Sequence, residues 1–385
     1  MSHKNTLFCQ ILQLIPRHEF QNTVNKYSGD KRARQLKCWT QFVTLLFGQI
    51  TGHSSLRSMT AGINSQLSYL YHIGIKSVKR STLSDANEKR NPKILEEVFY
   101  KLLNRTQSYA PGNKFRFKGK ILAFDSTTIN LCLNLCPWAQ FHHGKGAFKL
   151  HTAIDLAGNL PTFMVMTPGK VHDIKAARRI PFLPGTTLLM DKAYIDYKWL
   201  NELTDQGIFY VTRMKDNCQY KVRKCFDKLR NKGICADQEI RLTGVGKKKY
   251  PKSLRRISYR DPETGKHYVF ITNRFDLAAK TICNLYKARW EVELFFKTLK
   301  GQLRIDKFVG TSANAVLWQV WTAMIAYLIV SLIRFMNKIK WSVPSTMAVL
   351  AVSLFQKVDV KRLFSNAPHE RCINKASNQM LLFPI

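Results

Sequence analysis

The sequence predicts an α/β protein with a helical N-terminal domain and a β-rich insertion. Two changes of pattern along the 385 residues support this class. Apolar residues at helical spacing run through residues 1–115, and strand-like runs that alternate with helices begin near residue 116. Short strands joined by polar turns then interrupt the alternation over residues 214–275. A chain of this length can bury a full core without disulfides or a structural metal.

The role of the helical residues 1–115 has two interpretations. The run LKCWTQFVTLLFGQITG predicts a helix that stops at Gly52. Two further helices are predicted on either side of Pro92, the first with Ser81 as its N-cap. Because this pair begins with Lys-Arg-Ser-Thr at 79–82, it is a candidate helix-turn-helix unit that binds DNA. A plain helical bundle is the alternative, and both interpretations stay open.

Residues 116–340 predict a core built on a mixed sheet. The runs KILAFDSTTINLCLNL and FKLHTAIDLAGNLPTFMVMTPG predict three antiparallel strands, with a turn at Gly158-Asn159. TTLLMD and IFYVTRM predict two further strands, and the helix YKWLNELTDQG lies between them. Antiparallel strands followed by an alternation of helix and strand are typical of a mixed α/β sheet.

Residues 214–275 predict a basic β-rich insertion within that core. Four runs, QYKVRK, QEIRLTG, SLRRISYRD and KHYVFITNR, predict short strands. Residues 211–260 hold 16 Lys or Arg against 4 Asp or Glu, which makes this part strongly positive. A long helix is predicted after the insertion, capped by Asp276 and running to about Lys300. Residues 341–385 predict a C-terminal helical region.

One apolar stretch is long enough to be compared with a membrane span. Residues 316–333, VLWQVWTAMIAYLIVSLI, carry no charge and are just long enough to cross a bilayer. Gln319, Thr322 and Ser331 interrupt the stretch, and the sequence holds no second stretch of this kind. We therefore expect a buried core helix over 316–336 and no membrane partner.

The charge of the chain is unusual for a globular protein. Lys and Arg number 61 against 25 Asp and Glu, which gives a net charge of +36 and a pI near 10.0. An enzyme for small anions needs only a local positive patch. A surplus this large favours a polyanionic partner, of which nucleic acid is the most common.

The nine cysteines predict neither a disulfide framework nor a clear metal site. Their number is odd, they are scattered and no CxxC pair occurs, which suits reduced thiols in the cytoplasm. The nearest approach to a zinc motif is Cys132 and Cys136, followed by His142 and His143. The N-terminal residues have no long apolar core and no small-residue cleavage site, so we expect no signal peptide.

Two acidic residues directly follow apolar strands. Asp125 follows ILAF and Asp191 follows LLM, so each strand is expected to place a carboxylate at its carboxyl end, where α/β sheets hold functional groups. If the two strands are neighbours, the carboxylates converge and repel unless a cation lies between them, which favours a divalent ion. The alternative is that each Asp only caps the following turn.

The predicted helix LYKARWEVELFFKTLK carries four polar side chains on one stripe. Tyr286, Arg289, Glu293 and Lys300 follow one another at steps of three, four and seven, which are all helical returns. A pair of opposite charges at helical spacing usually belongs to a solvated face. This helix is largely apolar, however, and buried charge needs a partner, a metal or a phosphate to compensate it.

Together these segments resemble bacterial insertion-sequence transposases of the DDE type. The pattern Tyr-x2-Arg-x3-Glu-x6-Lys resembles the signature of the insertion-sequence-four family. AFDSTTINL resembles the first-Asp region, GAFKLHTAIDLAGNLP and TPGKVHDIKAARRIP resemble the stretches after it, and MDKAYIDYKWLNEL resembles the second-Asp region. The resemblance covers roughly residues 35–335 and includes the basic insertion. It implies an RNase H-like catalytic core with Asp125, Asp191 and Glu293 as its acidic triad.

The resemblance also implies a phosphodiester reaction that uses two metal ions. Two Mg²⁺ ions about 3.5–4 Å apart, with Mn²⁺ as an alternative, would activate the attacking water or DNA 3′-OH and stabilise the leaving oxygen. Asp125 would bridge both ions, while Asp191 and Glu293 would each hold one. The residues expected to contact phosphates near the transposon end are Tyr286, Arg289 and Lys300.

Trp290 and Asp173 each have two interpretations. Trp290 lies in the signature helix, where packing in the core is the ordinary expectation and stacking on a displaced DNA base is the alternative. Asp173 follows His172 and precedes a short helix, so it either caps that helix or belongs to the active site.

Basic residues at two other places are candidates for DNA contact. Lys149 and His151 alternate on one strand, so they share a face that is a candidate DNA-facing surface. The run GKKKYPKSLRR, in a chain of this charge, favours a phosphate-binding surface over a solvated charge run. Its first three lysines are Lys247, Lys248 and Lys249.

The sequence therefore predicts a DNA transposase whose residues 1–115 bind DNA. It would bind the inverted repeats at the element ends, cleave the DNA and join the freed 3′-OH ends to target DNA, with a hairpin at the element end as the resembled family implies. Its expected partners are double-stranded DNA, as transposon ends and target, and a second copy of the chain that pairs the two ends. We expect it in the bacterial cytoplasm, at the nucleoid. The alternatives are a structure-specific nuclease of the same fold and a non-catalytic DNA-binding remnant.

Overall fold

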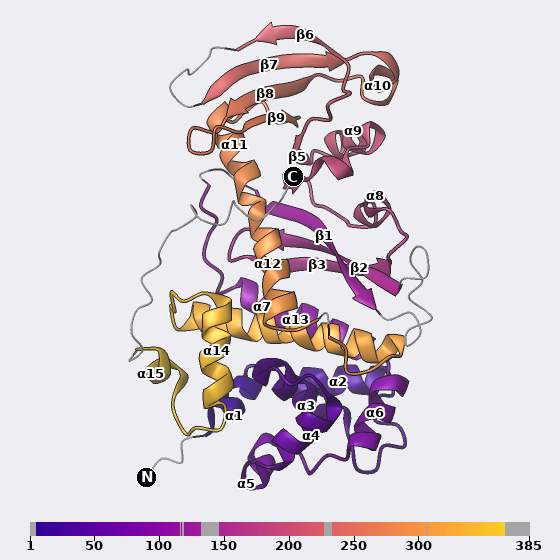
Figure 1. The fold of residues 1–385 in the computed structure, drawn as a ribbon, viewed down its shortest axis with the longest axis vertical. Coiled ribbons are helices and arrows are strands. Elements are labelled where there is room, and N and C mark those ends of the chain that lie inside the picture. The colour runs from indigo at the N-terminus through magenta and orange to yellow at the C-terminus, as the bar shows by residue number, and fades with distance from the viewer. Residues whose placement is uncertain are drawn as a thin grey trace.

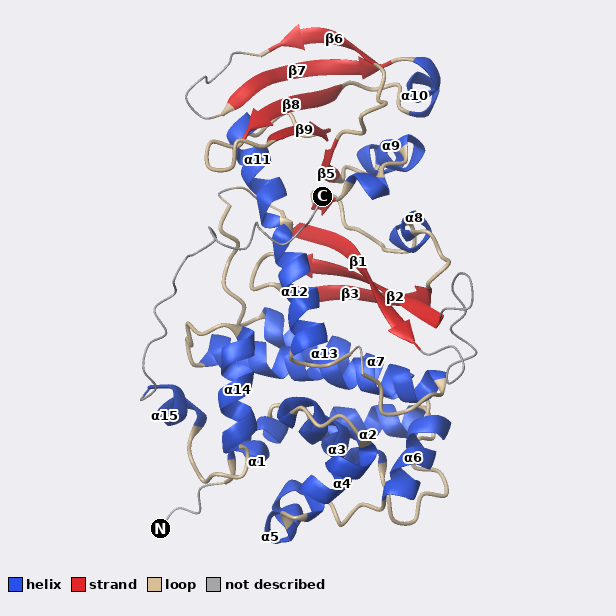
Figure 2. Ribbon diagram, in the orientation of Figure 1, coloured by secondary structure: helices blue, strands red, loops and turns tan. Residues whose placement is uncertain are grey.

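A twisted mixed sheet stands on a layer of helices in the computed structural model (Figure 1; Figure 2). The structure describes residues 5–365 except 116, 118, 132–145, 227–232 and 306. Nine strands form one sheet in the order β3-β2-β1-β4-β5-β9-β8-β7-β6. They are β1 (Ile121–Leu131), β2 (Gly146–Asp155), β3 (Leu160–Pro168), β4 (Thr187–Met190), β5 (Phe209–Arg213), β6 (Tyr220–Cys225), β7 (Ile234–Leu242), β8 (Leu254–Arg260) and β9 (His267–Thr272).

The first five strands have the mixed pairing that the sequence predicts. β1, β2 and β3 are antiparallel neighbours, whereas β1 pairs with β4 and β4 with β5 in parallel. Parallel neighbours need crossover connections, which here run over one side of the sheet. These connections contain α8 (Asp173–Ala177), η3 (Lys192–Tyr194) and α9 (Tyr197–Asp205).

The basic insertion forms the four predicted strands and extends the same sheet. β6, β7, β8 and β9 pair antiparallel in sequence, and β9 pairs antiparallel with β5. The insertion is therefore continuous with the core through backbone hydrogen bonds. A short helix, α10 (Gly244–Lys249), joins β7 to β8 and packs on α9.

The helical layer combines elements from both ends of the chain. α13 crosses beneath the sheet and packs against α7, α3 and α6, and α14 packs against α3 and α13 (Figure 1). The members of this layer are α1 (Leu7–Gln13), α2 (Arg17–Lys26), α3 (Cys38–Thr51), α4 (Leu56–Asn64), α5 (Leu67–Leu70), η1 (Tyr71–Ile73), α6 (Arg80–Lys89), α7 (Lys93–Gln107), α13 (Ala313–Met336), α14 (Val343–Ser353) and α15 (Val360–Ser365).

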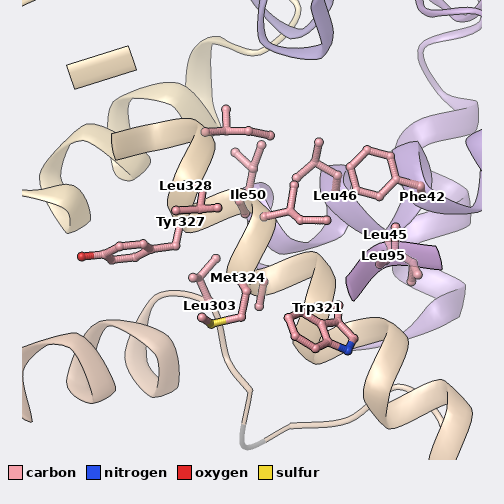
Figure 3. Packing of buried hydrophobic residues seen from close by; sticks show 14 of the residues in the cluster. Phe42, Leu45, Leu46, Ile50, Leu95, Leu303, Trp321, Met324, Tyr327 and Leu328 are labelled. Carbon is pink, nitrogen blue, oxygen red and sulfur yellow. The ribbon is translucent and has the colours of Figure 1, made fainter. Parts of the chain in front are cut away.

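The apolar helix α13 is the centre of the largest hydrophobic core. Figure 3 shows Trp321, Met324 and Leu328 of α13 packed among side chains of α3 such as Leu46 and Ile50. By length and composition α13 is the one helix of the described chain that would suit a membrane span, yet 94% of its most apolar window is buried inside the protein. The structure thus supports the core helix that the interrupted apolar pattern predicts.

Two predicted helix starts are wrong, and one predicted stop is correct. α3 ends where expected, because Gly52 adopts the left-handed conformation that closes a helix. α6 begins at Arg80 rather than after Ser81: the N–H of Leu83 bonds to the carbonyl of Lys79, so the first turn closes two residues earlier. Asp276 does not cap the long helix, since its carboxylate pairs with Arg274.

The predicted long helix is in fact two helices that meet at Arg289. α11 (Ala279–Ala288) begins after Ala278, and α12 (Trp290–Gly301) continues beyond the break. The N–H of Arg289 bonds three residues back to the carbonyl of Tyr286, and the N–H of Val292 bonds in the same way to Arg289. This tighter turn reorients the axis where the polar stripe meets the sheet.

Candidate active site

Three neighbouring parallel strands place charged side chains at one level of the sheet. Ala123 of β1 pairs with Leu189 of β4, which pairs with Val211 of β5. Two residues beyond these partners lie Asp125, Asp191 and Arg213. The expectation that the strands bearing the two Asp residues are neighbours is therefore correct, and the next strand adds a guanidinium to the same row.

The prediction that each Asp lies at the carboxyl end of its strand is correct for Asp191 and wrong for Asp125, which lies inside β1. β4 stops at Met190, so Asp191 follows the end of its strand. β1 continues to Leu131 because residues beyond Asp125 still pair with β2, for example Thr128 with Lys149. The pairing of β1 with β4 ends at Ala123, so Asp125 lies just beyond the part of β1 that β4 flanks.

The α11–α12 junction brings the polar stripe onto these carboxylates. Arg289 donates from Nη1 to Asp125 Oδ2 at 2.8 Å and from Nη2 to Glu293 Oε1 at 2.6 Å. The Tyr286 hydroxyl lies 3.5 Å from Asp191 Oδ1, and the Arg289 guanidinium lies over the Tyr286 ring. One guanidinium therefore spans two of the carboxylates, and a phenol connects the third to the same helix junction.

The surroundings of Asp125 and of Asp191 shift their pKa values in opposite directions. Burial raises the pKa of Asp125 to about 6, although the Ser126 N–H and the Arg289 charge act in the other direction. Burial also acts to raise the pKa of Asp191. The Lys192 N–H, the hydrogen bond from Arg213 and the nearby guanidinium charges outweigh it, so the pKa of Asp191 is lowered. The Arg213 bond to Asp191 Oδ1 is 3.0 Å long.

The donor chemistry of this cluster suits a divalent cation. Carboxylate oxygens are the ligands that Mg²⁺ prefers, and the raised pKa of Asp125 shows that its buried charge is only partly compensated by Arg289. Within the described residues no three His, Cys, Asp or Glu side chains are grouped closely enough to hold one ion, and the Arg289 guanidinium lies between Asp125 and Glu293. A cation shared by these carboxylates therefore requires Arg289 to leave this position.

A second polar network lies beneath the first, on the α8 side of the sheet. The Ser126 N–H donates to Asp125 Oδ1 at 2.8 Å, and the Ser126 hydroxyl donates to Asp173 Oδ1 at 3.0 Å. Lys149 Nζ donates to the same Asp173 oxygen at 3.1 Å and to the Val171 carbonyl at 3.3 Å. Asp173 is thereby connected to Asp125 through a single intervening residue.

His151 does not reach DNA, and Lys149 is engaged inside the protein. The two side chains do share a face of β2, but α8 packs on that strand and Thr167 of the neighbouring strand β3 lies beside His151. His151 is fully buried, its Nε2 lies 2.9 Å from the Thr167 hydroxyl, and burial lowers its pKa to about 4. The prediction of a DNA contact is wrong for His151. Lys149 uses two of its three donors for Asp173 and Val171 and its side chain is 19% exposed, so its contact with DNA stays a prediction.

The structure decides between the interpretations of Trp290 and of Asp173. Trp290 is 57% exposed at the start of α12, so packing in the core is wrong and its ring is available on the surface. Asp173 is the first residue of α8 and makes no capping bond there, because its carboxylate turns to Ser126 and Lys149. Its contacts therefore belong to the candidate site rather than to the helix end.

The remaining predicted DNA-contact residues lie on α12 and on the insertion. Lys300, at the far end of α12, donates to the Thr128 carbonyl of β1 at 3.0 Å. Three lysines are exposed together in the last turn of α10, within the insertion. They are Lys247, Lys248 and Lys249. The candidate zinc residues Cys132, Cys136, His142 and His143 lie outside the described residues.

Sequence reasoning missed Arg213 and Ser126. Arg213 ends the strand IFYVTRM and so obeys the rule that singled out Asp125 and Asp191, a polar residue that follows an apolar strand. Applying that rule to a basic residue would have found it. Ser126 carries no such signal, because its role depends on Asp173, which is 47 residues away in the sequence.

Comparison with known proteins identifies the relatives of this chain. The family model of the transposase DDE domain matches residues 116–329, and a domain of unknown function (DUF4372) matches residues 3–76. A protein of Sinorhizobium fredii named as transposase y4zB is 30% identical over 284 residues, which cover 72% of this chain and 78% of the relative. A protein of Geobacillus stearothermophilus named as the transposase for insertion sequence element IS5377 is 30% identical over 251 residues, 65% of this chain and 64% of the relative.

Two further comparisons are more distant. A protein of Synechocystis named as the transposase for insertion sequence element IS4SA is 25% identical over 308 residues, 76% of this chain and 81% of the relative. The cryo-electron microscopy structure of the piggyBac transposase synaptic complex with hairpin DNA aligns with a TM-score of 0.45 and 11% identity over 96% of this chain and 84% of that one. At this TM-score the structural likeness is loose.

The chain belongs to the family of transposases that carry a DDE domain. Its relatives named for insertion sequence elements make it a bacterial insertion-sequence transposase, as the order of its motifs predicts.

Proposed function

We propose that the chain binds the inverted repeats at the ends of its element, cleaves the DNA by metal-dependent phosphodiester hydrolysis and joins the 3′-OH ends to target DNA. The observation that supports this proposal is that Asp125 and Asp191 lie level on adjacent strands and that Arg289 bonds to both Asp125 and Glu293. The order of β1 to β5 suits the RNase H-like core that the sequence motifs imply. A homodimer would pair the two ends, in the bacterial cytoplasm at the nucleoid.

The three carboxylates are the groups that would hold Mg²⁺. When bound, two such ions activate the attacking oxygen and stabilise the leaving 3′ oxygen. Arg289 would then exchange the carboxylates for a DNA phosphate, since its planar fork suits either partner. Arg213 keeps Asp191 ionised, and the exposed Trp290 offers a surface on which a base can stack.

The test is the Glu293→Gln variant, which keeps the size of the side chain and removes its charge. We expect affinity for duplex DNA to survive, because that affinity rests on Lys and Arg. Mg²⁺-dependent nicking of a plasmid that carries the inverted repeats, and strand transfer of pre-cut ends, should both fall by about 100-fold or more, the scale set by loss of one catalytic electrostatic group.

Glu291→Gln is the matched control, because Glu291 lies half a turn away and bonds to Asn159 at 2.7 Å instead of to Arg289. It should keep both activities. Normal nicking by Glu293→Gln would refute the acidic triad. A wild-type chain that nicks but never joins pre-cut ends would be a nuclease of the same fold, and one that binds without nicking would be a DNA-binding remnant.

A further inference from the structure

A basic hollow lies in the helical layer, remote from the carboxylates. It is formed by the loop between α2 and α3 together with α6, and its volume is about 610 Å³. One carboxylate, that of Asp85, is among the lining residues. The lining cations are Lys31, Arg32, Arg34, Lys89 and Arg90.

Arg90 fixes the backbone of the loop from inside. Its Nε donates to the Gly29 carbonyl at 3.1 Å, its Nη2 donates to the Leu36 carbonyl, and its Nη1 donates to Gln41 Oε1 at 2.8 Å. The Asp30 carboxylate lies 3.6 Å from Nη2. Because one guanidinium holds both ends of the loop, the loop is ordered before any ligand binds, which lowers the entropic cost of binding.

The ordered loop presents three cations outward. Lys31, Arg32 and Arg34 are exposed, and no described residue gives their side chains a hydrogen bond or an ion pair. Arg32 adopts a φ of +61°, a left-handed conformation that is uncommon for a residue with a side chain. Three like charges held on one short loop repel one another, so a bound polyanion is the ligand that relieves them.

Two hydrogen bonds join the residues at the hollow to α13. The Trp318 Nε1 of α13 donates to the Arg90 carbonyl at 3.0 Å, and Asn314 Nδ2 donates to the Glu88 carbonyl at 2.8 Å. α13 in turn packs under the sheet. A ligand held here is therefore connected through α13 to the layer that packs on the sheet.

We propose that this hollow is a docking surface for the phosphate backbone of duplex DNA. The surface gives the α2–α3 loop, which lies in the segment matched by a domain of unknown function, a role separate from the chemistry at the carboxylates. Long, flexible cations around an open hollow suit phosphates rather than base edges, so the surface adds affinity and register but no sequence preference. It rests on the charges and the loop, not on the proposed catalysis.

The test measures the affinity for a random-sequence duplex over a series of salt concentrations. The triple variant Lys31→Ala, Arg32→Ala, Arg34→Ala removes exposed side chains only. The slope of log affinity against log salt is negative, and each lost phosphate contact reduces its magnitude by about 0.9, so we expect the magnitude to fall by up to about 2.7 together with weaker binding. A duplex of unrelated sequence should lose affinity to the same extent.

The matched control removes three exposed cations on the other side of the helical layer, where α15 lies in Figure 1. Its substitutions are Lys357→Ala, Lys361→Ala and Arg362→Ala, and its slope should stay at the wild-type value. An unchanged slope in the loop variant, or an equal decrease in both variants, overturns the proposal. Because binding is measured without Mg²⁺, a failure of catalysis would leave this result readable.

Discussion

At the scale of single residues, Asp125 and Asp191 have the same place on neighbouring strands and opposite surroundings. Asp125 is half-buried beside α12 and shares one guanidinium with Glu293, whereas Asp191 has its own arginine, Arg213. Their pKa values are therefore displaced in opposite directions. The difference predicts that removing the two charges changes stability with opposite sign.

Asp125→Asn should stabilise the metal-free protein at neutral pH. The pKa of Asp125 is raised from 3.8 to about 6 in the folded state, so folding favours the protonated form. That stabilisation is fully present below the unfolded pKa and is lost as the pH rises through about 6. Removing the charge should gain up to about 3 kcal/mol of unfolding free energy above the folded pKa, and little in acid. Urea denaturation in a chelator at several pH values measures the gain.

Asp191→Asn is the comparison for that experiment. Because its pKa is lowered, ionised Asp191 contributes stability above the unfolded pKa, and this stability is lost only as the pH falls through the folded value. Asp191→Asn should therefore destabilise the protein at neutral pH. A loss of stability in both variants would contradict the opposite environments described above.

At the scale of elements, β1, β2 and α8 are connected by the Ser126–Asp173–Lys149 network. Ser126→Ala removes the hydroxyl that joins Asp173 to the residue next to Asp125 and should cost about 0.5–1.5 kcal/mol of stability. We also expect more Mg²⁺ to be needed for half-maximal nicking, because the backbone that holds Asp125 Oδ1 loses its anchor. Titration of nicking with Mg²⁺ measures this shift.

Thr162→Ala separates positioning from a simple loss of stability. Its hydroxyl donates to the Ala153 carbonyl at 3.1 Å in the same sheet and has no bond to the carboxylate cluster. It should cost similar stability and leave the Mg²⁺ requirement unchanged. Equal shifts in both variants would show that Ser126 acts only through overall stability.

The last turn of α10 has a role that salt dependence can test. Lys247, Lys248 and Lys249 are exposed together on the insertion, and each phosphate contact they make should contribute about 0.9 to the salt slope. Replacing all three by Ala should lower DNA affinity and reduce the magnitude of the slope by up to about 2.7. A slope that stays at the wild-type value would show that the run is a solvated charge cluster.

The elements that sequence predicts well are those whose signal is local. Alternating and apolar runs predict every strand of the insertion, and Gly52 predicts the end of α3. The break at Arg289 is different, because the local pattern predicts one continuous helix, and the bond that the Arg289 guanidinium makes there is to Asp125, 164 residues away. The burial of His151 likewise depends on β3 and α8, which no pattern within β2 can report. The two acidic strand residues were found because their signal is also local.

At the scale of the whole molecule, positive surfaces lie on both sides of the acidic cluster. Figure 1 places α10 and α6 toward opposite ends of the longest axis, with β1 and the α11–α12 junction between them. A net charge of +36 distributed in this way favours a long polyanion that passes the carboxylates rather than a small ligand that enters a pocket. Such an arrangement requires the sheet and the helical layer to keep a fixed position relative to each other.

The helix α13 is the element that should enforce this relation, and Trp321→Ala tests it. Trp321 is 3% exposed, and its ring lies 5.3 Å from that of Phe99 in α7. The same core includes Ile154 of β2, so loss of the Trp321 ring should affect both the helical layer and the sheet. We expect a cost of about 3–5 kcal/mol and one unfolding transition, seen alike by circular dichroism and tryptophan fluorescence.

Trp290→Ala, on the surface, should cost about 0.5 kcal/mol or less. If Trp321→Ala instead unfolded the helices while the sheet kept its wild-type transition, the two layers would be independent domains, and a DNA docked on the helices would not be held in register with the carboxylates.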